Sequence, residues 1–182
     1  MWRVHRHIGM GGDQIVKAIA GEVVEREHGD SLRAMQPEEF RRLRDECAPL
    51  EGAHDLLVEL KRRELIVVLA SSSNEDDLDH FLEALDARSV VDGWTSSDDV
   101  ERTKPHPDVI HAALEKAGTQ DAVMVGDSRW DIEAAANAGL ETVCVITGGW
   151  SEQELRDHGA LSVFDSLVEL RERLDETPLG RA

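Results

Sequence analysis

The stretch Asp121–Gly139 reads D-A-V-M-V-G-D-S-R-W-D-I-E-A-A-A-N-A-G. Its apolar run, residues 122–125, has the length and the branched side chains of a β-strand. Asp127 and Asp131 follow this run, and an alanine-rich helical pattern then continues to a glycine stop. The stretch therefore predicts a strand that turns into a helix, with Asp127 at the carboxyl edge of a sheet.

Asp127 and Asp131 have two interpretations. Ligands of open α/β sheets bind at the carboxyl edge, and two carboxylates four residues apart suit a hard cation such as Mg²⁺. Each acid alone is as well explained as a helix cap. The remainder of the chain has to decide between the two.

The pattern after residue 48 alternates between strands and helices. We expect strands at 65–70, 123–125, 142–146 and 161–164, and helices at 53–63, 75–85, 107–117, 131–138, 151–157 and 167–174. Such alternation with short connections predicts a parallel, doubly wound α/β sheet with helices on both faces. We assign this core to residues 49–182.

Residues 1–48 are polar and helical, and we expect them to form a small separate module. One helix is predicted from Asp13 to Glu27, broken by Gly29 and Asp30. Pro37 then opens a second helix. The two cysteines, Cys47 and Cys144, are too few for a disulfide framework, and we expect both to be buried.

The composition excludes several classes of function. Hydrophobic residues make up 41% of the 182 residues, so the chain is globular rather than disordered. Its net charge of −18 disfavours nucleic acid and anionic membranes as partners. No apolar run approaches the roughly 20 residues of a membrane span, and the N-terminus is not a signal peptide. We therefore expect a cytoplasmic protein, and the oligomeric state stays open.

Two further sites follow predicted strands or loops. Ser71, Ser72 and Asn74 come directly after the strand at 65–70, where hydroxyl groups and backbone amides can hold a phosphate oxygen; the alternative is that they cap the next helix. Lys104 lies in T-K-P-H-P-D, where two prolines fix the backbone and hence the direction of the lysine. Its ammonium suits a phosphate or a paired carboxylate, and the alternative is an exposed loop lysine.

The order and spacing of these sites resembles a known family. S-S-S after a strand, K-P-H-P-D, and then V-G-D-S-x-x-D-I are similar to the second, third and fourth motifs of the haloacid dehalogenase-like hydrolase superfamily. The resemblance covers nearly the whole chain, with residues 1–48 similar to the helical cap of that family. T-G-G-W near Thr147 resembles its phosphatase branch.

This resemblance implies phosphoryl transfer through an aspartyl-phosphate, with Mg²⁺ as cofactor and a small phosphorylated metabolite, such as phosphoglycolate, as substrate. Ser71, with Ser72 and Asn74, would bind the phosphoryl group, and Lys104 would hold the charges of nucleophile and phosphate together. Asp127 and Asp131 would form the metal side, Asp131 by orienting either the water shell of the metal or Lys104. Such catalysis is mostly positioning and electrostatic stabilisation.

Other members of the superfamily give alternatives. A phosphomutase similar to β-phosphoglucomutase is the nearest one. A dehalogenase is less favoured, because that branch needs no metal. A third hypothesis, from a different class, is a non-catalytic remnant that only binds Mg²⁺ or phosphate.

The first motif of the family, D-x-D-G-T, does not occur in the 182 residues. In the family it supplies the nucleophile and lies on the first core strand, between the strands that correspond to 65–70 and 123–125. We therefore expect a truncated reading of a longer gene that is inactive as it stands. Burial of five aliphatic residues on that strand is worth roughly 10 kcal/mol, which rivals the stability of a whole domain.

The segment H-R-H-I-G-M, residues 5–10, gathers basic groups in an acidic chain. In caps of the family the matching stretch faces the active site. Arg6 is therefore expected to bind a second anionic group of the substrate. The alternative is the solvated end of a helix.

Overall fold

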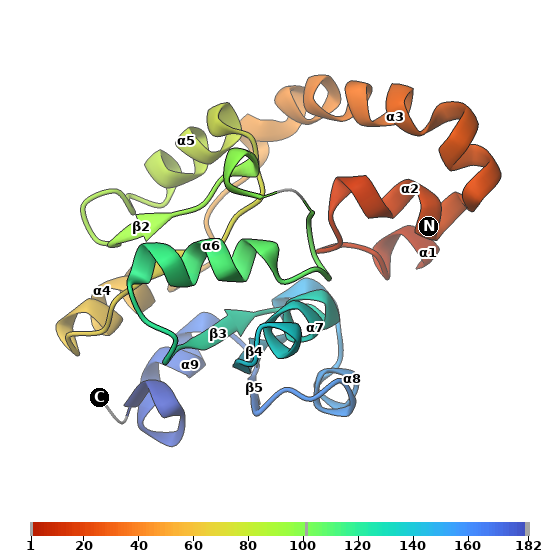
Figure 1. The fold of residues 1–182 in the computed structure, drawn as a ribbon. Helices are drawn as coiled ribbons and strands as arrows, with labels where there is room; N and C mark the ends of the chain where they lie inside the picture. Colours follow the sequence, from red (N-terminus) through yellow and green to blue (C-terminus); the bar gives the residue numbers. More distant parts are fainter. Residues whose placement is uncertain (1, 101, 181–182) are drawn as a thin grey trace.

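The computed structural model describes residues 2–100 and 102–180. Its strands form two parallel sheets in a single α/β body (Figure 1). One sheet pairs β1 (Val68–Leu69) with β2 (Gly93–Trp94). The other has the order β3 (Val123–Gly126), β4 (Glu141–Val145), β5 (Ser162–Phe164). Every pairing is parallel, which confirms the predicted fold class.

Helices alternate with the strands along the chain. They are α4 (Ala53–Arg62), α5 (Glu75–Ala84), α6 (Asp108–Ala117), α7 (Arg129–Asn137), α8 (Glu152–Asp157) and α9 (Leu167–Glu172). These bounds agree closely with the predicted helices. The strand expected at 65–70 is shorter than predicted, since only two of its residues pair with β2.

Side chains of β3 alternate between two apolar clusters. Val123 and Val125 pack against the cluster that contains Leu57 of α4 and Leu170 of α9. Met124 packs against the cluster that contains Val109 of α6. Because successive side chains of a strand point to opposite faces, helices cover both faces of this sheet. No helix in the described part of the chain is long and apolar enough to cross a membrane.

The N-terminal helices are α1 (Trp2–His5), α2 (Gly12–Ala20) and α3 (Glu22–Leu43), followed by the 3₁₀ turn η1 (Arg44–Glu46). Figure 1 shows α3 arching over the top of the molecule, away from the strands. The helix break predicted at Gly29 and Asp30 is wrong, because the chain breaks at Gly21 instead, where φ is +87°. Pro37, expected to start a helix, lies inside α3.

The N-terminal helices bury almost nothing of their own. Among residues 3–48, only Gly11 and Gly29 are buried. Cys47 is exposed, so the expectation that both cysteines are buried is wrong for this one and confirmed for Cys144. The helical region contacts the core at two ends: Phe40 against Phe81, at 5.9 Å between ring centres, and the segment 5–13 against the loops after the strands.

The two sheets share one core without joining. Leu69 of β1 and Val125 of β3 pack on the same apolar cluster, yet in the described residues β1 pairs only with β2 and β3 only with β4. All four residues of β3 are only half-buried, whereas residues 142–145 of β4 are buried. Interior strands of a doubly wound sheet are normally buried on both faces. Here β1 and β3 each keep one unpaired edge.

Candidate functional site

The loops that follow the strands bring the predicted site residues to one edge of the molecule. Asp127 and Ser128 follow β3, Thr147 follows β4, and Ser71 follows β1. Lys104 reaches this edge from the loop before α6. This is the carboxyl edge, where ligands of such sheets bind.

Lys104 and Asp131 form the centre of the site. The Nζ atom of Lys104 donates a hydrogen bond of 2.7 Å to Oδ1 of Asp131, and the two side chains are 19% and 7% exposed. The sequence left open whether Lys104 is an exposed loop lysine. The structure answers this: the lysine is largely buried and paired with a carboxylate.

The second oxygen of Asp131 holds the loop in front of α7. Its Oδ2 accepts hydrogen bonds from Asp127 N at 3.2 Å, Ser128 N at 3.0 Å and Ser128 Oγ at 2.7 Å. Burial raises the pKa of Asp131, but Lys104 and the Ser128 hydroxyl outweigh it, so the pKa is lowered overall. Both oxygens are thus occupied by protein donors, which favours the second of its predicted roles, orienting Lys104. Direct ligation of a metal by Asp131 stays a prediction.

Asp127 has the opposite electrostatic environment. Burial, and then the charge of Asp131, raise its pKa above 3.8, and the one side-chain hydrogen bond of its carboxylate among the described residues comes from Thr147 Oγ1, at 3.1 Å. Gly148 packs against its backbone so closely that a Cβ there would overlap Asp127 O. A desolvated carboxylate next to another one is stabilised by a cation.

The residues present fit part of a magnesium site. Mg²⁺ is usually held by one or two carboxylates plus waters and substrate phosphates. Asp127 offers an oxygen with no partner among the described residues. Nowhere in residues 2–100 and 102–180 do three or more His, Cys, Asp or Glu side chains converge as metal ligands. The donor set here is therefore suited to a partly hydrated ion and not to a closed protein cage.

The loop after β1 is shaped by hydroxyl groups. Ser71 Oγ accepts a hydrogen bond of 3.1 Å from Ser73 N, and Ser71 N donates one of 2.9 Å to Thr95 Oγ1. Thr95 is fully buried and also donates to Ser71 O at 2.7 Å. Thr95 follows the two-residue strand β2 and was not among the predicted site residues. The only available signal was a hydroxyl residue directly after Trp94.

Asn74 and Ser72 differ in their surroundings. The Asn74 side chain caps α5, accepting from Asp77 N at 3.0 Å and donating to Asp77 Oδ2 at 2.6 Å. This is the capping alternative left open by the sequence. Ser72 is half-buried in the same loop. Within the described residues, Ser71 and Lys104 share no hydrogen bond or ion pair. Phosphate binding by the serine loop, residues 71–74, therefore stays a prediction.

Arg6 is engaged with the core. Its guanidinium pairs with Glu154 and lies 3.9 Å from the centre of the Trp150 ring. His7 stacks on Trp130 at 6.0 Å between ring centres, and Trp130 is buried. The side chains of Arg6 and His7 are therefore packed on the core, whereas Ile8 and Gly9 of the same segment are exposed. Binding of a substrate anion by Arg6 stays a prediction, and it requires exchange with Glu154.

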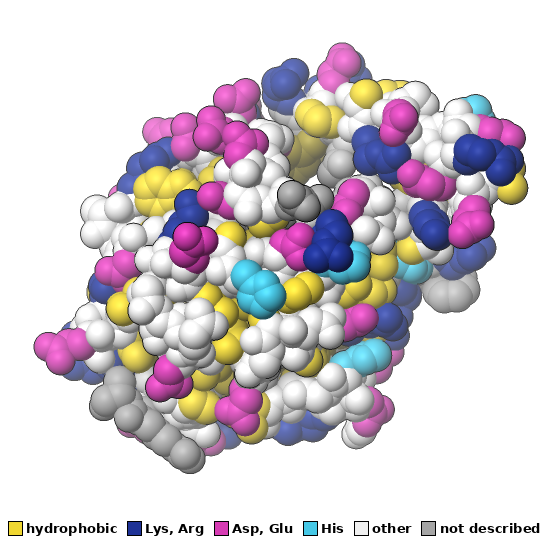
Figure 2. Space-filling view, in the orientation of Figure 1, with side chains coloured by type: hydrophobic (Ala, Val, Ile, Leu, Met, Phe, Trp, Pro, Cys, Tyr) yellow, Lys and Arg dark blue, Asp and Glu magenta, His cyan; other side chains and the backbone are white. Residues whose placement is uncertain are grey.

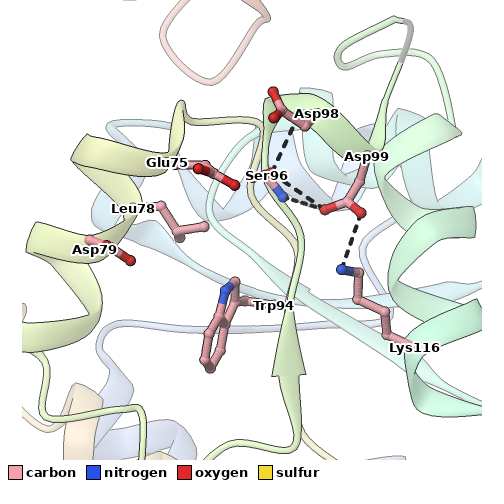
Figure 3. Close-up of a pocket in the computed structure, with 8 residues that line it drawn as sticks. All are labelled: Glu75, Leu78, Asp79, Trp94, Ser96, Asp98, Asp99 and Lys116. Carbon is pink, nitrogen blue, oxygen red and sulfur yellow. Dashed lines mark hydrogen bonds and ion pairs between the residues drawn. The ribbon is translucent and has the colours of Figure 1, made fainter.

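An acidic pocket of about 370 Å³ opens beside the serine loop (Figure 3). Ser97 N, next to this pocket, donates to Ser73 O at 2.9 Å. The pocket is lined by Glu75, Leu78, Asp79, Trp94, Ser96, Asp98, Asp99 and Lys116. Its lysine already pairs with Asp99 at 3.1 Å. The excess of carboxylates makes this pocket unsuitable for a phosphate.

Charges are unevenly distributed over the face shown in Figure 2. Acidic side chains gather over α5, whereas acidic and basic side chains are interspersed over the helices α1 to α3. Residues 2–43, which contain α1 to α3, hold seven Lys and Arg and seven Asp and Glu, so the net charge of −18 lies on the remainder of the chain. An anionic substrate is therefore repelled less by this end than by the core.

The sequence model of the family described as "Haloacid dehalogenase-like hydrolase" matches residues 2–145. The chain belongs to the haloacid dehalogenase-like hydrolase family. This confirms the resemblance, which rested on the motifs around Ser71, Lys104 and Asp127.

Two relatives of this family are named phosphatases. Phosphoglycolate phosphatase of Rhodospirillum rubrum is 31% identical over 121 residues, which is 65% of this chain and 50% of the relative. Pyrophosphatase PpaX of Bacillus cereus is 33% identical over 97 residues, 52% of this chain and 45% of the relative. The chain therefore spans about half the length of the relatives it matches.

A solved structure agrees over almost the whole chain. A hydrolase from Pseudomonas syringae is 32% identical, with a TM-score of 0.87, covering 96% of this chain and 82% of that one. The arrangement of N-terminal helices and parallel sheets is thus shared with another hydrolase of known structure.

Proposed function

We propose that these 182 residues form the phosphate-binding and metal-binding side of a Mg²⁺-dependent phosphatase for small phosphorylated metabolites. The observation that carries the proposal is the grouping of Lys104, Asp131 and Asp127: a largely buried lysine held by one carboxylate, next to a second carboxylate with a raised pKa. This grouping supplies a positive charge for a phosphoryl oxygen and a negative one for a metal.

Each residue has a distinct role in this proposal. Lys104 neutralises charge on the phosphoryl oxygens, and such electrostatic stabilisation, together with positioning, supplies most of the catalysis at a phosphoryl-transfer site. Asp131 keeps the ammonium in place and fixes the backbone around Asp127. Asp127 would hold Mg²⁺, which when bound supplies Lewis-acid stabilisation of the phosphoryl group. Ser71 and the backbone amides after it bind another phosphoryl oxygen.

The nucleophile is proposed to come from outside these residues. D-x-D-G-T is absent from the sequence, and β1 and β3 have unpaired edges above a common core. A strand between them, parallel to both, would end beside Ser71 and Asp127. An aspartate at the end of this strand would lie where it can attack the phosphorus. The isolated chain is then inactive but able to bind ligand.

The substrate class follows from the relatives and from charge. The phosphatases similar to this chain are named for phosphoglycolate and for pyrophosphate, both small and each with two anionic groups. Arg6, in the turn after α1, would exchange Glu154 for the second anionic group of such a substrate. We therefore propose a small phosphate ester with a second negative group.

Turnover tests the proposal directly. Phosphate release from p-nitrophenyl phosphate and from phosphoglycolate is measured with Mg²⁺, using the 182-residue chain and a chain extended in frame upstream of Met1. We expect activity only from the extended chain, lost on chelation and in Lys104→Ala. The control Lys116→Ala removes a lysine whose partner, Asp99, lies in the acidic pocket.

A non-catalytic binding protein is the second candidate, favoured by the absence of the D-x-D-G-T motif. An in-frame stop codon close upstream of Met1, with no such motif before it, would leave this candidate in place of the first. Turnover by the short chain that disappears in Asp127→Ala would instead show that a nucleophile lies within residues 1–182.

A further inference from the structure

The loop that carries Lys104 is held from the N-terminal helices as well as from the core. On the core side, Asp131 binds the ammonium, and Asn137 Nδ2 donates to Pro105 O at 3.1 Å. On the other side, Gly11 N donates to Lys104 O at 3.2 Å. The backbone of the lysine thus depends on a residue more than 90 positions earlier in the chain.

A second contact reinforces this link. The hydroxyl of Thr103 donates a hydrogen bond to Oδ1 of Asp13, in the first turn of α2. Burial raises the pKa of Asp13, but the hydrogen bonds from Thr103 and Gln14 outweigh it and the pKa is lowered. The carboxylate is therefore held in its charged, accepting form. Two adjacent residues of the lysine loop are bound by two residues at the start of one helix.

The close approach is possible only because residue 11 is glycine. Gly11 is buried, and a Cβ at this position would overlap both Oγ1 and Cβ of Thr103. Its φ of −65° is open to any residue, so the requirement is for space and not for conformation. At Gly12, one residue later, a Cβ would meet only the end of the flexible Gln36 side chain, at 3.1 Å.

The rest of the segment has separate attachments to the core. Gly9 packs on Ser128 and Trp130, His5 lies on Gly149, and Arg6 pairs with Glu154. Residues 5–13 therefore touch the loops after β3 and β4 as well as the Lys104 loop. A movement of the N-terminal helices would change the contacts of all three loops.

We propose that Gly11, Asp13 and Thr103 position Lys104. The packing of the N-terminal helices against the core then determines where the phosphate-site lysine lies. The naming of Lys104 as a phosphate-site residue rests on the proposed function, whereas the positioning itself does not. When the N-terminal helices pack against the core, the loop that carries Lys104 is bound on both sides. When they move away from it, the loop loses its hydrogen bonds to Gly11 and Asp13 and keeps only its contacts to the core.

Acylation of lysines provides the test, because the sequence has only four of them: Lys17, Lys61, Lys104 and Lys116. The 182-residue protein is pulsed with acetic anhydride at fixed pH, and the modification of each lysine is measured by mass spectrometry. Lys61 and Lys116 pair with Asp92 and Asp99 in the core and serve as internal references. Asp131→Asn is the positive control, since it weakens the direct partner of Lys104.

Thr103→Val removes the hydroxyl at nearly constant volume, and we expect the Lys104 rate, relative to Lys61 and Lys116, to rise roughly two- to tenfold, as when one ordinary hydrogen bond is lost. Thr103→Ser retains a hydroxyl, and its Lys104 rate should equal that of the wild type. Gly11→Ala should raise it and Gly12→Ala should not. A merely structural role of Thr103 would raise all three core rates together.

Equal Lys104 rates in the wild type, Thr103→Val and Gly11→Ala would overturn the positioning. A second arm repeats the pulse with Mg²⁺ and inorganic phosphate, which should protect Lys104 in the wild type. If phosphate gives no protection while Thr103→Val still exposes the lysine, the phosphate site is wrong and the positioning stands. If phosphate protects but Thr103→Val changes nothing, the positioning is wrong and the site stands.

Discussion

Lys104 and Asp131 lie 27 positions apart in the sequence, and their side chains meet at 2.7 Å beneath the carboxyl edge of the sheet. The lysine comes from a loop fixed by two prolines, and the aspartate comes from the first turn of α7. Since Asp131 also accepts from the backbone of Asp127 and Ser128, one carboxylate couples the lysine loop to the loop after β3.

Asp131→Ala leaves the ammonium of Lys104 unpaired and removes the acceptor for two loop amides. Breaking a buried ion pair in this way costs about 3–5 kcal/mol. We expect a loss of this size in the free energy of unfolding, measured by urea denaturation. Glu133→Ala on the same helix removes an exposed carboxylate, 3.9 Å from Arg129, and should change the value by less than about 0.5 kcal/mol. Equal losses in both variants would contradict the coupling.

Asp127→Asn should stabilise the protein without metal at neutral pH. The pKa of Asp127 is raised in the folded state, so the carboxyl stabilises the fold while protonated, and this contribution is lost as the pH rises through the folded-state pKa. In thermal unfolding from pH 3 to pH 8, the melting temperature of the variant should rise relative to that of the wild type above about pH 4. A variant that is less stable than the wild type at pH 7 would show that Asp127 is not electrostatically strained.

Gly148→Ala should disturb the loop after β4. The added Cβ would overlap the backbone oxygen of Asp127, which cannot move without β3. Overpacking of this kind costs about 1–3 kcal/mol, which differential scanning calorimetry would detect as a lowered melting temperature. Gly93→Ala, whose added Cβ would meet Lys116 only at 3.9 Å, is the matched control. If both alanines are tolerated equally, the loop does not pack on Asp127 as described.

The two thiols should differ in reactivity. Cys47 is exposed, whereas Cys144 is fully buried in β4, and burial raises the pKa of its thiol to about 12. Only the thiolate reacts with disulfide reagents, so Ellman's reagent at pH 8 should titrate one thiol in the native protein and two in guanidinium chloride. Two rapidly reacting thiols in the native state would show that the β3–β4–β5 sheet is open.

The sequence was informative where a local pattern decides the structure. The apolar run before Gly126, the alanine-rich helix after it and the polar residues at both junctions sufficed to place Asp127 and Asp131. Helices α4 to α9 were predicted for the same reason, since the apolar residues of each recur at helical spacing. The family motifs then linked Ser71, Lys104 and Asp127, whose spatial relation no single pattern contains.

Other features depend on tertiary packing and left no local signal. Strand β2 has only two residues, so the buried Thr95 after it was missed. Gly29 was expected to end a helix, but Glu25 and Arg33 pair across it at 2.8 Å, and the chain turns at Gly21. Gly11 and Thr103 lie in segments that are distant in the sequence, and the spacing of apolar residues cannot predict such a contact.

The central claim is that Lys104 and Asp127 form one phosphate and metal site within these 182 residues. Isothermal titration of inorganic phosphate into the protein, with and without Mg²⁺, tests it most directly. We predict phosphate binding that is strengthened by Mg²⁺, lost in Lys104→Ala, made independent of Mg²⁺ in Asp127→Asn, and unchanged in Lys116→Ala. Phosphate binding that is absent, or equal in Lys104→Ala and Lys116→Ala, would contradict the claim.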